Sequence, residues 1–357
     1  MLRPKTFFAS ANTSEGFVSY FDTIFDVNVL KEILIIKGGP GTGKSGLMSR
    51  IANVAERKGM SVERFICSSD PASLDGIIIE ELGIAMVDGT APHTFDPKYP
   101  GAVETIINTG SFWNKDVLLQ KKSQIIPLIQ DKNRSYKRAY QFLKACGEIT
   151  KEIEQIGMNG LDTKKMNQCV NRITKRIFKK SNNNSLKIRI TSAVGKDGKI
   201  TLDSFQNESK TIYVVEDRCS TAYAFLERLY EEGKEANQAM TISFSCILPN
   251  EIDSIYFPDL NCCFCIGERN YEKEQCEKIY HYINMRRFVS DEVYKANRHK
   301  IRFGTRCIEM LMDGAVDAFA QAAETHRLLE KIYVSAMDFD RFGEMSDAWI
   351  HTLFKEE

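Results

Sequence analysis

Several features are missing from this 357-residue sequence, and each absence excludes a class of protein. The chain has no net charge, since 48 Lys and Arg residues balance 48 Asp and Glu residues, and this argues against a general affinity for nucleic acid or anionic membranes. No apolar run approaches the roughly 18 residues that a membrane span needs. The first residues, Met1 to Thr6, lack the apolar region of a signal peptide. We therefore expect a cytoplasmic protein without a membrane span.

Paired C-x-x-C motifs, a common spacing of structural metal sites, are also absent, although the chain has ten cysteines. Three of these cysteines, Cys262, Cys263 and Cys265, lie in an apolar run at 261–266. We expect a buried strand in which the thiols act as small hydrophobic groups. A metal or redox role is the alternative.

A complete phosphate-loop motif follows the first strong strand pattern. Residues 33–36 form a short β-branched apolar run, which predicts a buried strand. The pattern G-x-x-x-x-G-K-[ST] follows at once, and residues 46–58 then carry apolar side chains at helical spacing. The residues assigned to the nucleotide site are Gly38, Gly39, Pro40, Gly41, Thr42, Gly43, Lys44, Ser45 and Gly46.

The residue types of this loop match the chemistry of a triphosphate. Glycines let the backbone direct successive N–H groups at phosphate oxygens, and the following helix adds the positive end of its dipole. Lys44 is expected to reach the β- and γ-phosphates, and the Ser45 hydroxyl to ligate Mg²⁺. The sequence therefore predicts a nucleoside triphosphate site with magnesium, and ATP is the expected nucleotide.

A second magnesium ligand should follow a neighbouring strand. Residues 83–87 form an apolar strand pattern that ends in Asp88, which we assign to magnesium, either directly or through water. A turn aspartate before Gly89 is the alternative. No Glu follows Asp88, so the catalytic base is left unassigned. His93 is a candidate base or γ-phosphate sensor, and a loop histidine without a catalytic role is the competing interpretation.

Two further aspartates lie between the phosphate loop and Asp88. Asp70 before Pro71 has the pattern of a helix N-cap followed by proline at the first helical position. Asp75 would then lie one helical turn further on, either at the surface or in the site.

The sequence also contains an internal duplication. A shift of 179 positions aligns Ile33–Ile36 with Ile212–Val215, and the loss of one residue after Cys67 then aligns the following segments. In the second copy Gly38, Gly43, Lys44 and Ser45 are replaced by Asp217, Ala222, Tyr223 and Ala224, and Asp88 is replaced by Ile266. We predict that this copy binds no triphosphate in the same manner. Chance similarity between two strand–helix–strand units is the alternative.

The predicted fold is α/β, a three-layer sheet of the P-loop NTPase type that is duplicated and carries helical extensions. Each half is expected to have a mainly parallel sheet of about four strands, which begins at 5–10 or at 187–191. The predicted boundaries are 1–116 for the first half, 117–180 for its helical extension, 181–185 for a linker, 186–270 for the degenerate half and 271–357 for the C-terminal helices.

A basic stretch precedes the second half. Thr163 to Arg189 holds nine Lys or Arg residues and no acidic residue. A solvated helix face, binding of nucleic acid or another polyanion, and charge supplied to a bound phosphate are the three interpretations. Arg218, in the altered loop, is a candidate arginine finger.

Taken together, the motifs resemble a poorly characterised bacterial family of duplicated P-loop ATPases. The segments that carry the resemblance are Phe7–Thr13 with Gly16-Phe17, Gly38–Ser45, Cys67–Pro71 with Leu74–Gly76, Val87–His93, Asp96–Ala102 and Ala336–Phe339. The resemblance implies ATP binding. Members of this family often keep a phosphate loop in both halves, and this sequence departs from that pattern in its second half.

The leading functional prediction is a magnesium-dependent ATPase with one active site in the first half, in which Lys44 and Asp88 act on the phosphates. A small-molecule kinase and a non-catalytic nucleotide-dependent switch are the alternatives. The sequence identifies no protein client.

Overall fold

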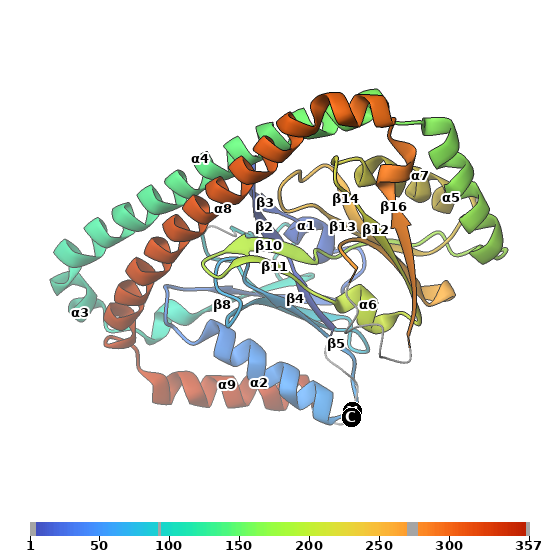
Figure 1. Ribbon diagram of the computed structural model, residues 1–357. Helices are drawn as coiled ribbons and strands as arrows, with labels where there is room; N and C mark the ends of the chain where they lie inside the picture. The colour runs from blue at the N-terminus through green and yellow to red at the C-terminus, as the bar shows by residue number, and fades with distance from the viewer. Residues whose placement is uncertain (1–4, 92–93, 270–277, 355–357) are drawn as a thin grey trace.

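The computed structural model describes residues 5–91, 94–269 and 278–354 and contains two six-stranded sheets with the same strand order (Figure 1). In both sheets only the third strand runs antiparallel to its neighbours. The first sheet consists, in spatial order, of β1 (Lys5–Phe8), β5 (Val62–Ile66), β6 (Leu74–Ile79), β7 (Ile84–Asp88), β4 (Glu32–Lys37) and β8 (Glu104–Asn108). The second sheet consists of β9 (Leu186–Ile188), β13 (Met240–Phe244), β14 (Ile252–Phe257), β15 (Cys262–Ile266), β12 (Thr211–Glu216) and β16 (Ile279–Asn284). The repeated order confirms the duplication.

The strand count differs from the prediction of about four mainly parallel strands for each half. The prediction of a helix after Asp70-Pro71 is wrong. Pro71 lies in a tight turn that is closed by a hydrogen bond of 2.9 Å from Ser73 N to Asp70 O. Strand β6 follows this turn, and its β-branched run at 77–79 favours extended backbone. Strand β16 comes from the segment that the sequence assigned to the C-terminal helices.

Two hairpins and several helices complete the described fold. The hairpins are β2 (Ser10–Thr13) with β3 (Gly16–Ser19), and β10 (Ser192–Gly195) with β11 (Gly198–Thr201). The helices are α1 (Phe21–Ile24), α2 (Lys44–Arg57), α3 (Lys115–Gln120), α4 (Lys122–Gly160), α5 (Thr163–Ile177), α6 (Ser204–Glu208), α7 (Ala222–Glu235), α8 (Asp291–Val334) and α9 (Phe339–Leu353), with short 3₁₀ turns at Thr109–Phe112, Pro258–Leu260 and Met285–Phe288. No helix in the described ranges combines the length and the apolar character needed to cross a bilayer.

The two sheets share one apolar core, so the expected three-layer arrangement within each half is not what the structure has. Inward-facing residues of both sheets, among them Ile33, Phe65, Ile212 and Cys263, lie in a single buried cluster with residues of α1 and α6. Helices cover the opposite faces, α2 and α9 on the first sheet and α5 and α7 on the second. An apolar strand face does not encode whether a helix or a sheet covers it. The prediction that the cysteines at 262–265 are buried in a strand is confirmed.

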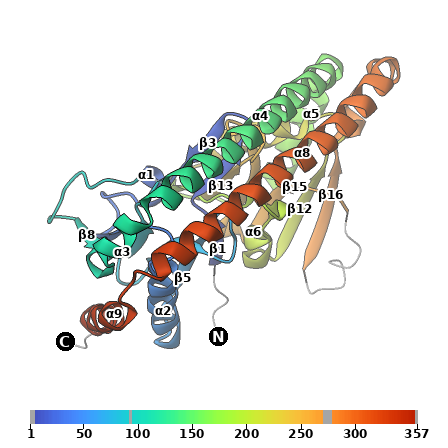
Figure 2. The ribbon, with the colours of Figure 1, turned by 90° about the vertical axis from the view of Figure 1, so that its left-hand side faces the viewer.

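The helical extensions are exchanged between the halves (Figures 1 and 2). Helices α4 and α8 lie side by side in opposite directions across both sheets. Helix α5, which follows the first half, packs on α7 of the second, and α9, which follows the second half, packs on α2 of the first. The ends of the extensions are fixed by equivalent hydrogen bonds, from Asn114 N to Ala336 O at 2.6 Å and from Ser290 N to Gly160 O at 2.8 Å. Neither half therefore forms its helical face alone.

The basic stretch at 163–189 is divided by this packing. Helix α5 buries Met166, Val170 and Thr174 and leaves its lysines exposed. Arg189 instead forms a buried ion pair with Glu63 of the first sheet, with 2.7 Å between its guanidinium and the carboxylate. One residue of the stretch therefore joins the halves, and the lysines of α5 lie on the solvated face of that helix.

Candidate functional site

The first six residues of the predicted phosphate-loop motif form the loop between β4 and α2, and its last two residues, Lys44 and Ser45, begin α2. Gly41 and Gly43 have positive φ angles of 68° and 84°, which glycine adopts without strain. A Cβ atom on Gly43 would also lie only 2.6 Å from a ring carbon of Phe342 in α9. Glycine is therefore required at this position both by its backbone conformation and by the exchanged helix that packs against it.

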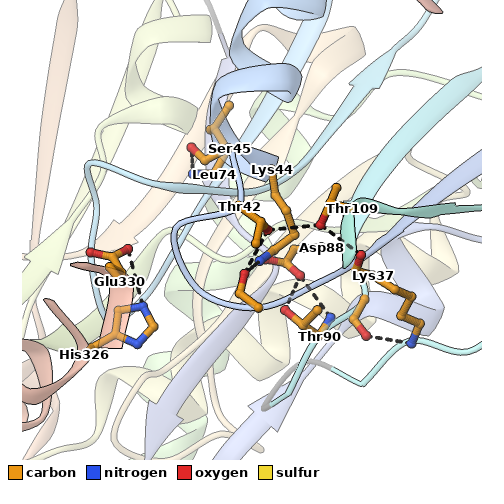
Figure 3. Close-up of polar contacts among 12 residues, drawn as sticks. Lys37, Thr42, Lys44, Ser45, Leu74, Asp88, Thr90, Thr109, His326 and Glu330 are labelled. Atoms are coloured by element: carbon orange, nitrogen blue, oxygen red, sulfur yellow. Dashed lines mark hydrogen bonds and ion pairs between the residues drawn. The ribbon is translucent and has the colours of Figure 1, made fainter. Parts of the chain in front are cut away.

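Lys44 and Asp88 meet beside this loop (Figure 3). Lys44 Nζ donates a hydrogen bond of 2.7 Å to Gly39 O and lies 3.6 Å from Asp88 Oδ2. The Thr90 backbone N–H and hydroxyl both donate to Asp88 Oδ1 and orient the carboxylate. Strand pairing brings the two elements together, because Asp88 ends β7 and lies opposite Ile36 of β4.

Ser45 and Asp75 lie on the adjoining side of the loop. Ser45 Oγ accepts a hydrogen bond of 2.9 Å from Leu74 N, at the start of β6. Gly76 pairs with Val87, so Asp75 lies one residue further along, opposite Asp88 at the same end of the sheet. Asp75 is only 4% exposed. Burial of the Cys67 thiol and the nearby Asp75 carboxylate raise the pKa of that thiol. A buried carboxylate therefore lies beside the predicted magnesium ligands.

The long helices contribute ionisable groups that the sequence prediction missed, and three of them interact at the Lys44 end of the cavity. His326 and Glu330 come from α8, with 3.6 Å between His326 Nε2 and Glu330 Oε1, and Lys132 comes from α4. Burial and the nearby ammonium groups of Lys132 and Lys44 lower the pKa of His326 to about 4, so its ring is neutral at pH 7. Burial raises the pKa of Glu330 and lowers that of Lys132. No local sequence motif indicates these residues, because helix exchange alone brings them to the loop.

All of these groups line one cavity of about 1250 Å³. Its floor consists of the phosphate loop and the ends of β5, β6 and β7, and its walls are α4, α8 and the tip of the β2–β3 hairpin. The lining groups of the predicted site are Gly38, Pro40, Gly41, Thr42, Gly43, Lys44, Ser45, Gly46 and Asp88. The structure thus brings the predicted loop residues and Asp88 to a common space.

The other sequence candidates differ in their positions. Asp70 lines the cavity but forms an ion pair of 2.7 Å with Lys196 of the second half. His93 lies outside the described residues. Arg218 is not among the residues that line the cavity, and lies in the altered loop of the second half.

The equivalent loop of the second half is shorter, and the Asp217 carboxylate binds its N–H groups. Helix α7 begins at Ala222, so five residues separate it from β12, against six in the first half. The missing residue is therefore in this loop and not after Cys67, as the sequence alignment had placed it. The Asp217 carboxylate accepts hydrogen bonds from Cys219 N at 2.9 Å and from Ala222 N at 2.8 Å.

Helix α4 closes this second loop from outside. A Cβ on Gly157 would lie 2.4 Å from Cys219 O, and Cys219 packs into an apolar cluster with Ile153 and Ile301. A carboxylate thus takes the loop N–H groups that a phosphate would need, and apolar side chains fill the space above them.

The oxygen groups beside Lys44 suit a hard cation. No group of three or more His, Cys, Asp or Glu side chains in the described ranges could hold a metal ion alone. Mg²⁺ commonly uses one or two carboxylates together with substrate phosphates, and the Ser45 hydroxyl with the Asp88 carboxylate fits that requirement.

No protein-family model, no curated protein and no solved structure matches this chain. Its function has to be inferred from the chemistry of the cavity.

Proposed function

We propose that the first half binds a nucleoside triphosphate with Mg²⁺, with ATP as the expected nucleotide, and hydrolyses its terminal phosphate. The supporting observation is the cavity in which an intact phosphate loop, Lys44, Ser45 and two carboxylates converge. Loop N–H groups and the start of α2 offer the positive field that phosphates need.

Each side chain has a distinct task in this proposal. Lys44 leaves its hydrogen bond to Gly39 O and its contact with Asp88 to bind the β- and γ-phosphates. Ser45 and Asp88 would hold Mg²⁺, which would supply positive charge to the phosphate oxygens. Lys132, half-buried on the opposite wall, faces the same phosphates as a second cation.

Asp75 is the proposed proton acceptor for the attacking water. It replaces the Glu that the sequence lacks after Asp88, since its position on β6 places it opposite Asp88 and one residue from the amide that holds Ser45. A carboxylate within hydrogen-bond reach of the nucleophile contributes typically about 10²- to 10⁴-fold in rate.

Binding and turnover with ATP and GTP, in the presence and absence of Mg²⁺, test this function. Wild type is expected to bind Mg·ATP and release phosphate, and Lys44→Ala is expected to lose binding by about 100-fold or more, equivalent to about 2.7 kcal/mol. Equal nucleotide binding by wild type and Lys44→Ala would refute the site. Tight binding with negligible phosphate release would instead identify a nucleotide-dependent switch.

A further inference from the structure

The cavity is larger than one nucleotide requires. Its volume of about 1250 Å³ exceeds the roughly 300–1,000 Å³ of most small-molecule sites. Its α4 wall extends from Ile129 to Lys151, which corresponds to about 33 Å of helix at 1.5 Å per residue. The phosphate loop lies at one end of this wall.

The strand order shows where the additional space lies. If Asp88 holds Mg²⁺ as proposed, the terminal phosphate would lie on the Asp88 side of the loop, at the end of β7. The floor then continues in the same direction past Asp75 on β6 and Ser69 after β5, as far as the hairpin tip at 14–17.

On the opposite side, towards β8, the loop is closely packed. Thr109 Oγ1 donates to Thr42 Oγ1 at 3.0 Å, and Tyr333 packs against Gly39. A Cβ on Gly46, in the first turn of α2, would meet no atom within 4 Å, so the cavity is open on that side of the loop. The space over β6 and β5 therefore lies beyond the terminal phosphate, away from the nucleoside.

Three lysines of α4 line the cavity: Lys132 beside the proposed phosphate site, and Lys137 and Lys144 further along the helix in the outer space. In the described part of the chain none of the three forms an ion pair or a hydrogen bond with another residue. Burial lowers the pKa of Lys132, because removal from water disfavours the charged ammonium group. Lys132 and Lys144 are separated by about 18 Å along the helix.

Three acidic residues around the outer space, in contrast, have an ion-pair or hydrogen-bond partner in the protein. Asp70 pairs with Lys196 at 2.7 Å, and Glu148 lies 3.7 Å from Lys151. Glu15 accepts a hydrogen bond of 3.3 Å from Asn250. Lys137 and Lys144 thus differ from Lys151 and Lys196, which are paired with carboxylates, and they are available to an anionic ligand.

The wall between these lysines is already formed. Asn12 is fully buried and donates to Val194 O at 2.8 Å, while its side-chain oxygen accepts a hydrogen bond of 2.8 Å from the Tyr140 hydroxyl. This network ties the first hairpin, the second hairpin and α4 together. A ligand would therefore meet a preorganised surface, which lowers the entropic cost of binding.

We propose that the outer part of this cavity binds a second small molecule that carries phosphate or carboxylate groups, at the same time as the nucleoside triphosphate. Lys137 and Lys144 bind its anionic groups, and the ligand lies next to the terminal phosphate. This inference rests on the proposed nucleotide site and adds a co-substrate site to it.

The test uses inorganic phosphate as the probe and full-length protein saturated with the magnesium complex of a non-hydrolysable ATP analogue, which blocks the phosphate loop. Binding is followed by the ³¹P line width of the free phosphate. Wild type is expected to broaden the signal, and Lys137→Gln with Lys144→Gln to weaken phosphate binding about tenfold. Lys164→Gln with Lys175→Gln, on the exposed face of α5, is the matched control and is expected to behave as wild type.

The outcomes separate the two proposals. No broadening by the wild type, or equal broadening by wild type and the Lys137/Lys144 variant, overturns the co-substrate site. The affinity for the analogue, measured in parallel, should change less than about threefold in that variant. If the analogue fails to bind wild type, the nucleotide site is refuted. Phosphate binding to the nucleotide-free Lys44→Ala variant that still depends on Lys137 and Lys144 then supports the outer site alone.

Discussion

Replacement of Asp75 by Asn is the sharpest test of the catalytic assignment. The substitution keeps the size of a side chain that is 4% exposed and removes its ability to accept a proton. If Asp75 is the base, the turnover number should fall by about 10²- to 10⁴-fold, which raises the activation barrier by about 2.7–5.4 kcal/mol. Phosphate release under saturating Mg·ATP measures this change.

Nucleotide affinity should respond much less than turnover. Asp75→Asn removes one negative charge. This lowers the repulsion of the phosphates, which favours nucleotide binding, and it lowers the attraction of Mg²⁺, which opposes binding. We expect the dissociation constant to stay within about fivefold of wild type. Turnover within fivefold of wild type would exclude Asp75 as the base, and loss of binding as severe as in Lys44→Ala would reassign it to nucleotide binding.

The duplication supplies a matched control. Asp253 is the equivalent residue on β14, and its carboxylate accepts hydrogen bonds from Ser192 at 2.8 Å and Ser254 at 3.1 Å. Asp253→Asn weakens these charge-assisted bonds, so we expect about 1–2 kcal/mol lower stability in urea unfolding. Its turnover per folded molecule should equal that of the wild type.

Three other predictions follow from the same contacts. Gly43→Ala should reduce nucleotide binding at least tenfold and lower the melting temperature, because the added Cβ meets the Phe342 ring. Gly59→Ala is the control, because Gly59 has a φ of 81° and open space around it. This substitution should lower the free energy of unfolding by only about 1 kcal/mol and leave nucleotide binding unchanged. Asp217→Ala should lower the unfolding free energy by about 1–3 kcal/mol in urea titrations without altering turnover, because two loop N–H groups lose their acceptor; unchanged stability would contradict this role. His326 has a folded pKa of about 4, below its ordinary value of 6.5, so the unfolded state binds more protons between these values and stability should fall as pH drops through this range. His326→Gln should reduce that slope in urea midpoints measured from pH 7 to pH 4.5, and an unchanged slope would count against the assignment.

The predictable part of the site is the part encoded by local sequence. The strand before Gly38 and the helix after Ser45 follow from their periodicity, and Asp88 follows from its place at the end of an apolar strand. Asp75 is predicted on a helix because Asp70-Pro71 has the pattern of a helix N-terminus. The isoleucines at 77–79 favour extended backbone instead, and the structure has a strand there.

Tertiary packing determines the remainder. The apolar strands do not reveal that the two sheets cover each other, since buried strands are apolar whichever element lies on them. Glu330 and His326 lie on a helix whose amphipathic pattern predicts packing but not which half it packs against. Their place over the phosphate loop depends on the exchange of extensions, which involves contacts distant in sequence.

The two loops show how one scaffold can hold one open site and one closed site. Both halves present a strand, a loop and a helix to the same pair of long helices. In the first half, Tyr333 of α8 covers the loop beside a large cavity. In the second half, the absence of a side chain at Gly157 lets α4 lie directly on the loop. Removing Asp217 alone would free loop N–H groups without making room for a phosphate. The second half therefore packs against the first loop through α8 and α9, with Tyr333, Glu330 and Phe342 in contact with the loop glycines.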